Sequence, residues 1–172
     1  GPYRIDETAE LARAGRAGGR ALPAPGDLLA AGRQALRTRG RRAFTRLVSA
    51  RSDGDLERGF GPAAQRVFFA AMVRAFDPKM AMGFEGEIEF RLRRVGEETP
   101  WTIEIRGGRA SARAGAAKNA VVGIRSGAAD FLRLMAGEAQ PPALALDGRL
   151  EIDGDLAIAP RIGEMFGGPS PY

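Results

Sequence analysis

Hydrophobic positions change their spacing partway along this chain of 172 residues. Over residues 62–76 they recur at helical intervals, and Phe69, Val73 and Phe76 share one face. Such a stripe is typical of a helix packed against a core. Over residues 84–106 hydrophobic residues instead alternate with polar or charged ones, which is the pattern of half-buried antiparallel strands. The sequence therefore predicts a helix followed by a strand meander.

The same two periods place the remaining elements. We expect strands at residues 84–93, 101–106, 109–114, 120–125 and 149–152, and helices at residues 28–48, 62–76, 128–136 and 156–166. A turn is expected at residues 52–55 and a loop at the prolines 141–142. Because the strands run together and the helices lie at either end, the expected fold class is α+β, with a five-stranded mainly antiparallel sheet covered on one face by helices.

Charge separates the N-terminal part from the rest of the chain. Residues 1–50 hold ten Arg against four acidic residues, whereas the remainder is almost balanced, within a net charge of +5. We expect an N-terminal helical extension over residues 1–60 with a Pro/Gly linker near 22–26, a folded domain over 61–168 and a tail at 169–172. Because the basic excess is local and aromatic residues are nearly absent beside it, we predict no nucleic-acid partner.

The chain contains no cysteine and no histidine. Disulfides and thiolate metal sites are therefore excluded, as are mechanisms that need a His base within this chain. No carboxylate cluster has the spacing of a metal loop, and no Gly-rich stretch forms a phosphate-binding motif. We predict no catalytic residue, no cofactor and no metal. Since no run of about 18 apolar residues is present, we expect a cytoplasmic protein.

Residues 127–166 carry more apolar residues than a small sheet needs to cover one face. That surplus predicts a hydrophobic pocket rather than a catalytic cleft. Trp101 lies early in a predicted strand, where a structural role is favoured over stacking on a ligand. Glu138 and Glu164 are candidate acids of a buried site, although solvated surface carboxylates are the favoured interpretation. The strand glutamates are expected to form a charged ladder with arginines on the face opposite the apolar one.

Ordered signature positions in this part of the chain resemble those of the sterol carrier protein family, of the non-specific lipid-transfer type. They are Asp130-Phe131, Leu134-Met135, Gly137, Gly148-Arg149-Leu150, Ile152 and Gly154-Asp155. The pattern is an Asp-Phe helix that ends at a Gly, followed by a Gly-basic-Leu-x-Ile-x-Gly strand. The resemblance covers roughly residues 62–166, and residues 1–60 have no counterpart in the minimal family domain. The preference for Arg over Lys looks like that of a bacterial member.

The resemblance implies a hydrophobic tunnel between the sheet and its covering helices, in a domain that binds lipids. The expected ligand-binding residues are Ile103, Val122, Ile124, Phe131, Leu132, Met135, Ile158, Ile162, Met165 and Phe166. For any single one of these residues, plain core packing is the competing and more frequent interpretation. The set as a whole predicts a pocket better than any of its members does.

The expected function is the binding and carriage of hydrophobic molecules, such as fatty acyl chains, acyl thioesters, sterol-like or polyketide-like compounds. One alternative is an enzyme that uses the cavity as a reaction chamber, for instance for a cyclisation. It requires an Asp or Glu that points into the cavity. Another is an accessory domain that binds an enzyme partner through the N-terminal helices. The ligand's identity and the oligomeric state are left open.

Three arginines in the N-terminal part share a helical face. Arg33, Arg37 and Arg41 fall at i, i+4 and i+8. A basic amphipathic helix of this kind can lie transiently on an anionic membrane, which would suit a lipid carrier. The competing interpretation is a packed helix whose arginines simply face solvent.

Overall fold

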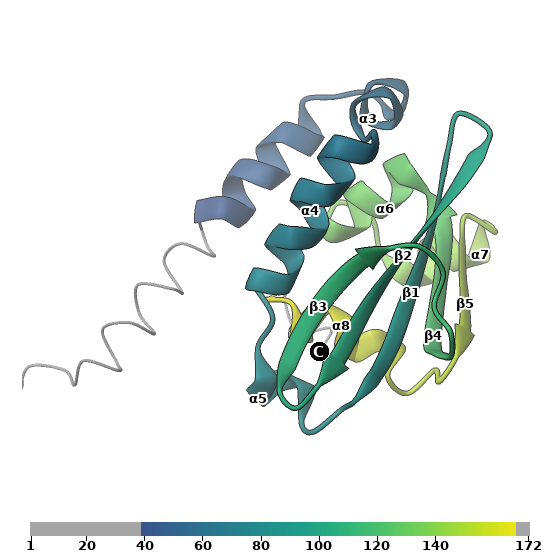
Figure 1. Ribbon diagram of the computed structural model, residues 1–172. Coiled ribbons are helices and arrows are strands. Elements are labelled where there is room, and N and C mark those ends of the chain that lie inside the picture. The colour runs from purple at the N-terminus through teal and green to yellow at the C-terminus, as the bar shows by residue number, and fades with distance from the viewer. Residues whose placement is uncertain (1–38, 168–172) are drawn as a thin grey trace, which may run out of the picture. The chain divides into compact units, whose positions relative to one another are not determined.

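Strand β1 (Gly86–Arg94) forms the centre of a five-stranded sheet in the computed structural model, which describes residues 39–167 (Figure 1). The strand order is β3-β2-β1-β4-β5. The other strands are β2 (Glu97–Arg106), β3 (Arg109–Ala114), β4 (Ala120–Gly127) and β5 (Leu150–Gly154). Three neighbouring pairs are antiparallel, and β1 with β4 is parallel. The sheet is thus mixed and mainly antiparallel, which confirms the expected α+β class.

The parallel pair requires the chain to cross the sheet between β3 and β4. Residues 115–119 make this crossing, and two strand carboxylates hold them in place. The Ala117 N–H donates to Glu89 Oε2 at 2.8 Å, and the Lys118 N–H donates to Glu87 Oε2 at 3.1 Å. Because Glu87 and Glu89 alternate with buried residues of β1, the crossing lies on the face away from the core.

The predicted charge ladder occupies this same open face of the sheet. Its ion pairs are Arg91–Glu89, Arg91–Glu98, Arg106–Glu104, Arg113–Glu87, Arg113–Glu104, Arg125–Glu98 and Arg125–Glu151. Cross-strand pairs of opposite charge contribute about 0.2–1 kcal/mol each. The open face is therefore a stabilised polar surface, and the apolar chemistry lies on the other side.

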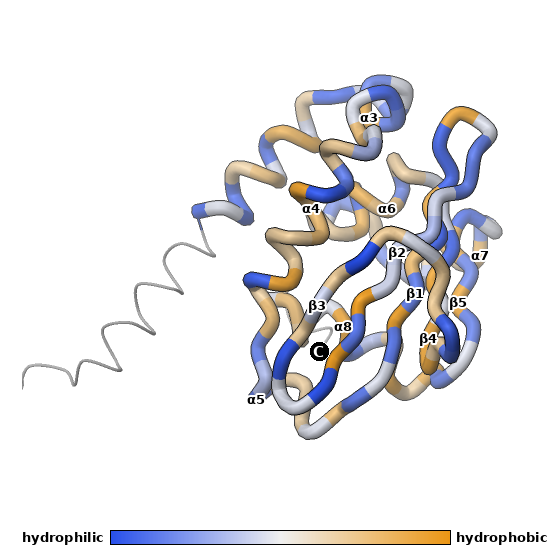
Figure 2. Tube along the Cα trace, in the orientation of Figure 1, coloured by the Kyte–Doolittle hydropathy of each residue, from blue (hydrophilic) through white to orange (hydrophobic). Residues whose placement is uncertain are grey.

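Helices cover that other side of the sheet. They are residues 39–49, α3 (Asp53–Gly59), α4 (Pro62–Arg74), α5 (Pro78–Ala81), α6 (Ala128–Met135), α7 (Pro141–Leu146), the 3-10 turn η1 (Ala159–Arg161) and α8 (Ile162–Met165). Figure 2 shows hydrophobic positions recurring along α4, α6 and the central strands, with hydrophilic positions between them. The hydrophobic positions with helical spacing and those with strand spacing thus face one another in one apolar layer between the sheet and the helices.

Aromatic rings fill the centre of this layer. The Phe69 ring of α4 stacks on Trp101 of β2 with ring centroids 4.6 Å apart. Phe131 of α6 meets both Phe69 and Phe90 of β1, at centroid distances of 6.2 and 5.6 Å. Ring pairs at such distances contribute about 0.5–1.5 kcal/mol beyond their burial. Aromatic packing therefore holds α4 and α6 against β1 and β2.

The segment before α4 shares this core. Val48, Leu56 and Phe60 are buried in the same hydrophobic cluster as the sheet, and the Phe44 ring lies 5.8 Å from that of Phe68. A domain boundary at residue 61 remains a prediction, but a deletion intended to leave the core intact must spare residues 39–60. The first part of the helix expected over residues 28–48 lies outside the described residues, together with Arg33 and Arg37.

Four local expectations were wrong. Residues 52–55 do not form a turn. Ser52 instead caps α3 by accepting a hydrogen bond from the Asp55 N–H at 3.2 Å. The prolines at 141–142 begin α7 rather than a loop, since Pro suits the first helical turn. Pro78 likewise starts the short helix α5, where no helix was expected. Residues 156–166 form a turn, η1 and α8 rather than one continuous helix.

Candidate functional site

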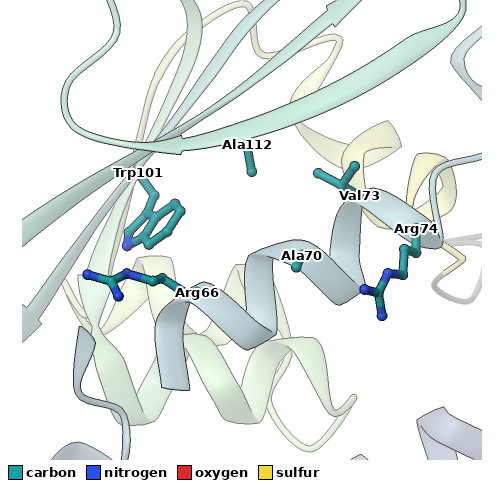
Figure 3. Close-up of a pocket in the computed structure, with 6 residues that line it drawn as sticks. All are labelled: Arg66, Ala70, Val73, Arg74, Trp101 and Ala112. Carbon is teal, nitrogen blue, oxygen red and sulfur yellow. The ribbon is translucent and has the colours of Figure 1, made fainter. Parts of the chain in front are cut away.

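A groove opens between α4 and the edge strand β3. Its volume is about 440 Å³, and it is lined by Arg66, Ala70, Val73, Arg74, Trp101 and Ala112 (Figure 3). Four of these residues come from α4, whereas Trp101 and Ala112 come from β2 and β3. The walls are mainly apolar, and the charges belong to the two arginines.

Helical spacing places the α4 residues along one wall. Arg66, Ala70 and Arg74 lie at i, i+4 and i+8, and Val73 lies beside them at i+7. Eight residues of helix rise about 12 Å, so the two arginines mark the two ends of the groove. In Figure 3 the Arg66 side chain extends toward Trp101, while Arg74 lies at the other end beyond Val73.

Small residues explain why this space is hollow. The residues of β3 that face the core layer are Ala110 and Ala112, and both pack only partly buried against it. Ala112 lies opposite Ile103 of β2, a residue with no exposed surface. Ala70 on α4 is equally short. The other strands of the sheet place Ile, Leu or Phe on this face. Between β3 and α4 the side chains are instead the methyl groups of Ala112 and Ala70, which leave a groove.

Trp101 forms the inner wall of the groove and is fixed by hydrogen bonds. Its indole Nε1 donates to Gln65 Oε1 at 2.9 Å, and Gln65 Nε2 donates to the Phe60 carbonyl at 2.9 Å. Trp101 is 6% exposed and Gln65 is 2% exposed. The buried polar groups of Trp101 and Gln65 are thus hydrogen-bonded. The indole ring is therefore held in place and presents a rigid apolar face to the groove.

The two groove arginines differ from those of the open sheet face. Within residues 39–167, the side chains of Arg66 and Arg74 make no hydrogen bond or ion pair, and both are exposed. Arg91 and Arg113, by contrast, each bridge two carboxylates. The groove therefore combines an apolar wall with two positive charges that no described side chain neutralises.

Comparison with known proteins places this architecture in a family. Residues 72–167 match the SCP-2 sterol transfer family. The chain belongs to this family. The match spans β1 to β5 and α6, the helix that carries Asp130-Phe131 and Leu134-Met135, so it confirms the resemblance found in the sequence. No curated protein sequence matches the chain.

Solved structures show the same fold. The stereoselective inverting sec-alkylsulfatase Pisa1 from Pseudomonas sp. is 20% identical with a TM-score of 0.50, over 61% of this chain and 16% of that one. This chain thus spans about a sixth of the sulfatase. Sterol Carrier Protein 2 from Yarrowia lipolytica, in its apo form, is 16% identical with a TM-score of 0.50, over 59% of this chain and 91% of that one.

The ten ligand contacts expected from the sequence all lie in the sheet–helix layer of this SCP-2 fold. Buried there are Ile103, Val122, Phe131, Leu132, Ile162, Met165 and Phe166, and partly buried against them are Ile124, Met135 and Ile158. The structure thus brings the set together in one cluster. None of the ten is among the six residues that line the groove. Their role as ligand contacts remains a prediction.

Sequence reasoning missed Arg66, Ala70, Val73, Arg74 and Ala112 as groove residues. Trp101 was noted in the sequence, with a structural role favoured. In the structure it stacks on Phe69 in the core and also lines the groove. The i, i+4, i+8 spacing of Arg66, Ala70 and Arg74 was the available signal. It could not be used, because the residues that α4 meets on β3 are set by tertiary packing.

Carboxylates do not enter this groove. None of its six lining residues is Asp or Glu, and residues 39–167 contain no group of three potential metal ligands. Glu138 accepts a hydrogen bond from the Ser49 hydroxyl and from Arg133 Nη1, the latter at 2.8 Å. The Ser49 hydroxyl, and then Arg133, lower the pKa of Glu138 despite an opposing effect of burial. A general acid requires the opposite shift.

Among the described residues, no helix is long and apolar enough to cross a membrane.

Proposed function

We propose that this protein binds and carries hydrophobic molecules, of the acyl, acyl thioester, sterol-like or polyketide-like classes. Membership of the SCP-2 family supports the binding of lipids or sterols in general. The observation that carries the proposal for this chain is the groove of about 440 Å³ between α4 and β3. That volume falls in the range of about 300–1,000 Å³ that small-molecule sites occupy.

The groove gives a bound chain an apolar surface next to the core. The ligand would lie along Ala70, Val73 and Ala112 and against the face of Trp101. Each methylene removed from water contributes about 0.8 kcal/mol, so even a partly buried acyl chain can reach micromolar affinity. No strong polar motif is needed for such binding.

A ligand that entered more deeply would contact the ligand-binding residues expected from the sequence. Trp101 stacks on Phe69, which in turn meets Phe131. In the proposed mechanism, movement of α4 away from β3 opens a path from the groove past these rings into the sheet–helix layer. Phe131, Met165 and the other eight expected contacts would then line the tunnel, and the same movement would release the ligand.

Two neighbouring alanines on α4 provide the test. Ala70 lines the groove and Ala71 does not, yet both are exposed. Ala70→Phe should fill the groove and weaken binding of dodecanoate at least about tenfold, whereas Ala71→Phe should leave it unchanged. Titration calorimetry and native mass spectrometry of both variants measure this difference. Equal affinities in the two variants would remove the groove from the account.

A more specific part of this proposal is contact with a membrane. Arg41, one of the three arginines expected there, donates from Nη1 to the Gly167 carbonyl at 2.9 Å. Its neighbours Arg42 and Arg46 are exposed beside Thr45 in a second hollow of about 300 Å³. A transient anionic membrane contact through Arg33, Arg37 and Arg41 stays part of the proposal, and Arg42 and Arg46 would add to the positive charge of this helix. Vesicle binding that is abolished at about half-molar salt supports it, and binding that is absent or insensitive to salt contradicts it.

An accessory role is the second candidate. The observation that favours it is the sec-alkylsulfatase likeness, in which the matched region is 16% of a longer chain. Deleting residues 1–38, which leaves the described core intact, should then abolish retention of an enzyme partner while dodecanoate binding persists. The chamber-enzyme alternative needs a carboxylate in the cavity, and the groove residues provide none.

A further inference from the structure

Strand β3 forms one edge of the sheet, and its outer backbone groups are unpaired. The Gly115 N–H donates to the Pro100 carbonyl at 2.9 Å, which fixes the alternation of hydrogen bonds in the antiparallel β2–β3 ladder. The residues whose N–H and C=O groups point away from β2 are then Ala110, Ala112 and Ala114. Among the described residues, none donates to or accepts from these groups. The edge can therefore pair with another strand.

Helix α4 runs along this edge, antiparallel to β3 (Figure 1). At the start of α4, Gln65 accepts the hydrogen bond of Trp101, the residue opposite Ala114. Just past its end, Pro78 lies beside Gly108 in the β2–β3 turn. The groove of about 440 Å³ between α4 and β3 thus follows the direction of the strand. Side chains on the helix side of an added strand would enter this groove.

The charges that line the groove are both positive. Arg66 and Arg74 lie at its two ends, about 12 Å apart along α4, and their side chains make no hydrogen bond or ion pair among the described residues. In an extended chain four residues span about 13 Å, and side chains i and i+4 point to the same face. Two acidic side chains at this spacing can therefore each meet one of the two arginines.

We propose that β3 and α4 form a docking site for an extended acidic segment of a partner protein, which adds to the sheet as a sixth strand antiparallel to β3. The central residue of the segment lies opposite Ala112 and places an apolar side chain in the groove. The residues two positions before and after it are acidic, one beside Arg66 and the other beside Arg74. In strand addition, main-chain hydrogen bonds supply affinity and alternate side chains supply specificity. This surface goes beyond the binding of hydrophobic molecules and does not depend on it.

A second copy of the chain fits the same edge less well. Pairing two β3 strands would place Arg109 and Arg113 of one copy beside those of the other, and like charges on neighbouring strands destabilise a sheet. Strand β3 contains no Asp or Glu that could meet the groove arginines. Charge complementarity thus favours an acidic partner segment.

Four seven-residue peptides test the proposal. Acetyl-TETVTET-amide carries two Glu around a central Val, and acetyl-TKTVTKT-amide carries Lys in their place. The other two are the Glu peptide with an N-methyl group on the Val, whose N–H would face β3, or on the Thr after it, whose N–H would face solvent. Trp101, the chain's single tryptophan, reports binding by its fluorescence, and titration calorimetry measures the affinity.

The full chain should bind the Glu peptide at least about tenfold more tightly than the Lys peptide at low salt. Methylation of the Val should weaken binding at least about tenfold, whereas methylation of the Thr should leave it unchanged. Arg66→Gln/Arg74→Gln should remove the preference for Glu over Lys. The control Arg46→Gln/Arg93→Gln loses the same charge at exposed positions outside the groove and should keep that preference.

Equal binding of the two methylated peptides would overturn the inference, because no strand is then added. Equal binding of the Glu and Lys peptides would overturn it as well. A protein that sediments as a dimer and binds no peptide would assign the edge to a second copy instead. Dodecanoate binding, measured separately, distinguishes the two proposals: binding of dodecanoate without peptide removes only this inference, and binding of peptide without dodecanoate supports it while removing the proposed function.

Discussion

The indole nitrogen of Trp101 donates a hydrogen bond to the Gln65 side chain at 2.9 Å and so joins β2 to α4 across the inner wall of the groove. Gln65 in turn donates to the Phe60 carbonyl. Replacing Gln65 with Leu leaves both the indole N–H and that carbonyl unpaired in a buried site. Each unpaired group costs about 1–3 kcal/mol.

We therefore expect Gln65→Leu to lower the free energy of unfolding by at least about 1 kcal/mol and to change the emission of Trp101. Urea denaturation followed by fluorescence measures both effects. Gln140→Leu, at an exposed position, serves as the control and should stay within about 0.5 kcal/mol of the wild-type protein. A Gln65→Leu protein as stable as this control would show that the hydrogen-bond chain contributes nothing.

Gly154 shows what a family signature residue does physically. It ends β5 with φ +92°, and a Cβ built on it would lie 2.1 Å from the Val121 carbonyl oxygen. That close approach lets the Asp155 N–H donate to the same oxygen at 2.9 Å. The Gly-Asp pair of the signature thus closes β5 against β4.

Gly154→Ala should therefore destabilise the fold by at least about 2 kcal/mol, from backbone strain and steric overlap together. Gly137→Ala is the matched control, because Gly137 also has a positive φ, +81°, but open space around it. Its cost should be about 1 kcal/mol. Chemical denaturation of both variants separates the two contributions. Equal losses would mean that the contact with Val121 is relieved by a small shift of the backbone.

Val95 is a site where the sequence can be improved. It occupies the first position of the two-residue turn between β1 and β2, with φ +49°, and is 70% exposed. A β-branched residue is strained there, and the turn type favours Asn-Gly. We expect Val95→Asn to raise the free energy of unfolding by up to about 1 kcal/mol.

Thermal denaturation measures this gain. Val67→Asn is the control, since Val67 is 71% exposed but lies within α4, where the two residues have similar helix propensity. A Val95→Asn protein that is no more stable than the wild type would indicate that the turn adopts another conformation in solution.

We expect Glu89 to make the fold sensitive to acid. Burial of its carboxylate tends to raise the pKa, but the Ala117 N–H and Arg91 outweigh that effect and hold the pKa below the ordinary value of 4.5. A carboxyl whose pKa is lowered in the folded state adds stability above its unfolded pKa. That stability is lost as the pH falls through the lower, folded pKa.

Glu89→Gln should accordingly be less stable than the wild type near neutral pH, and the difference should shrink as the pH falls below about 4. Urea denaturation across this pH range measures the difference. Glu97→Gln, at an exposed position near the β1–β2 turn, should follow the wild-type profile. A Glu89→Gln deficit that is the same at every pH would assign the effect to shape and not to charge.

Periodicity predicted most of this fold because each sheet face has one consistent environment. The alternation in β1 and β2 marked Ile88, Phe90 and Ile103 as inward, and all three are buried. The expected span of β3, residues 109–114, coincides with the observed strand. The short helices α5 and α7 were not predicted, because so few residues show no hydrophobic period. In addition, the local sequence does not distinguish a Pro that begins a helix, as in α7, from a Pro that ends one.

The candidate site was harder to predict because it depends on register. Ala112 lines the groove only because it lies opposite Ile103 at the edge of the sheet, under α4. The local sequence Arg109–Ala114 carries no sign of that neighbour. Spacing predicted the apolar layer, and the family resemblance implied a hydrophobic binder, but neither indicates where two elements leave a groove.

The most direct test of the account is a titration of the full chain with dodecanoate, followed by Trp101 fluorescence and by native mass spectrometry. The account predicts a saturable change in emission and a mass increase of one ligand per chain. It also predicts that Ala70→Phe weakens both signals. A protein that shows neither a saturable change nor a bound ligand would contradict the central claim that this fold carries hydrophobic molecules.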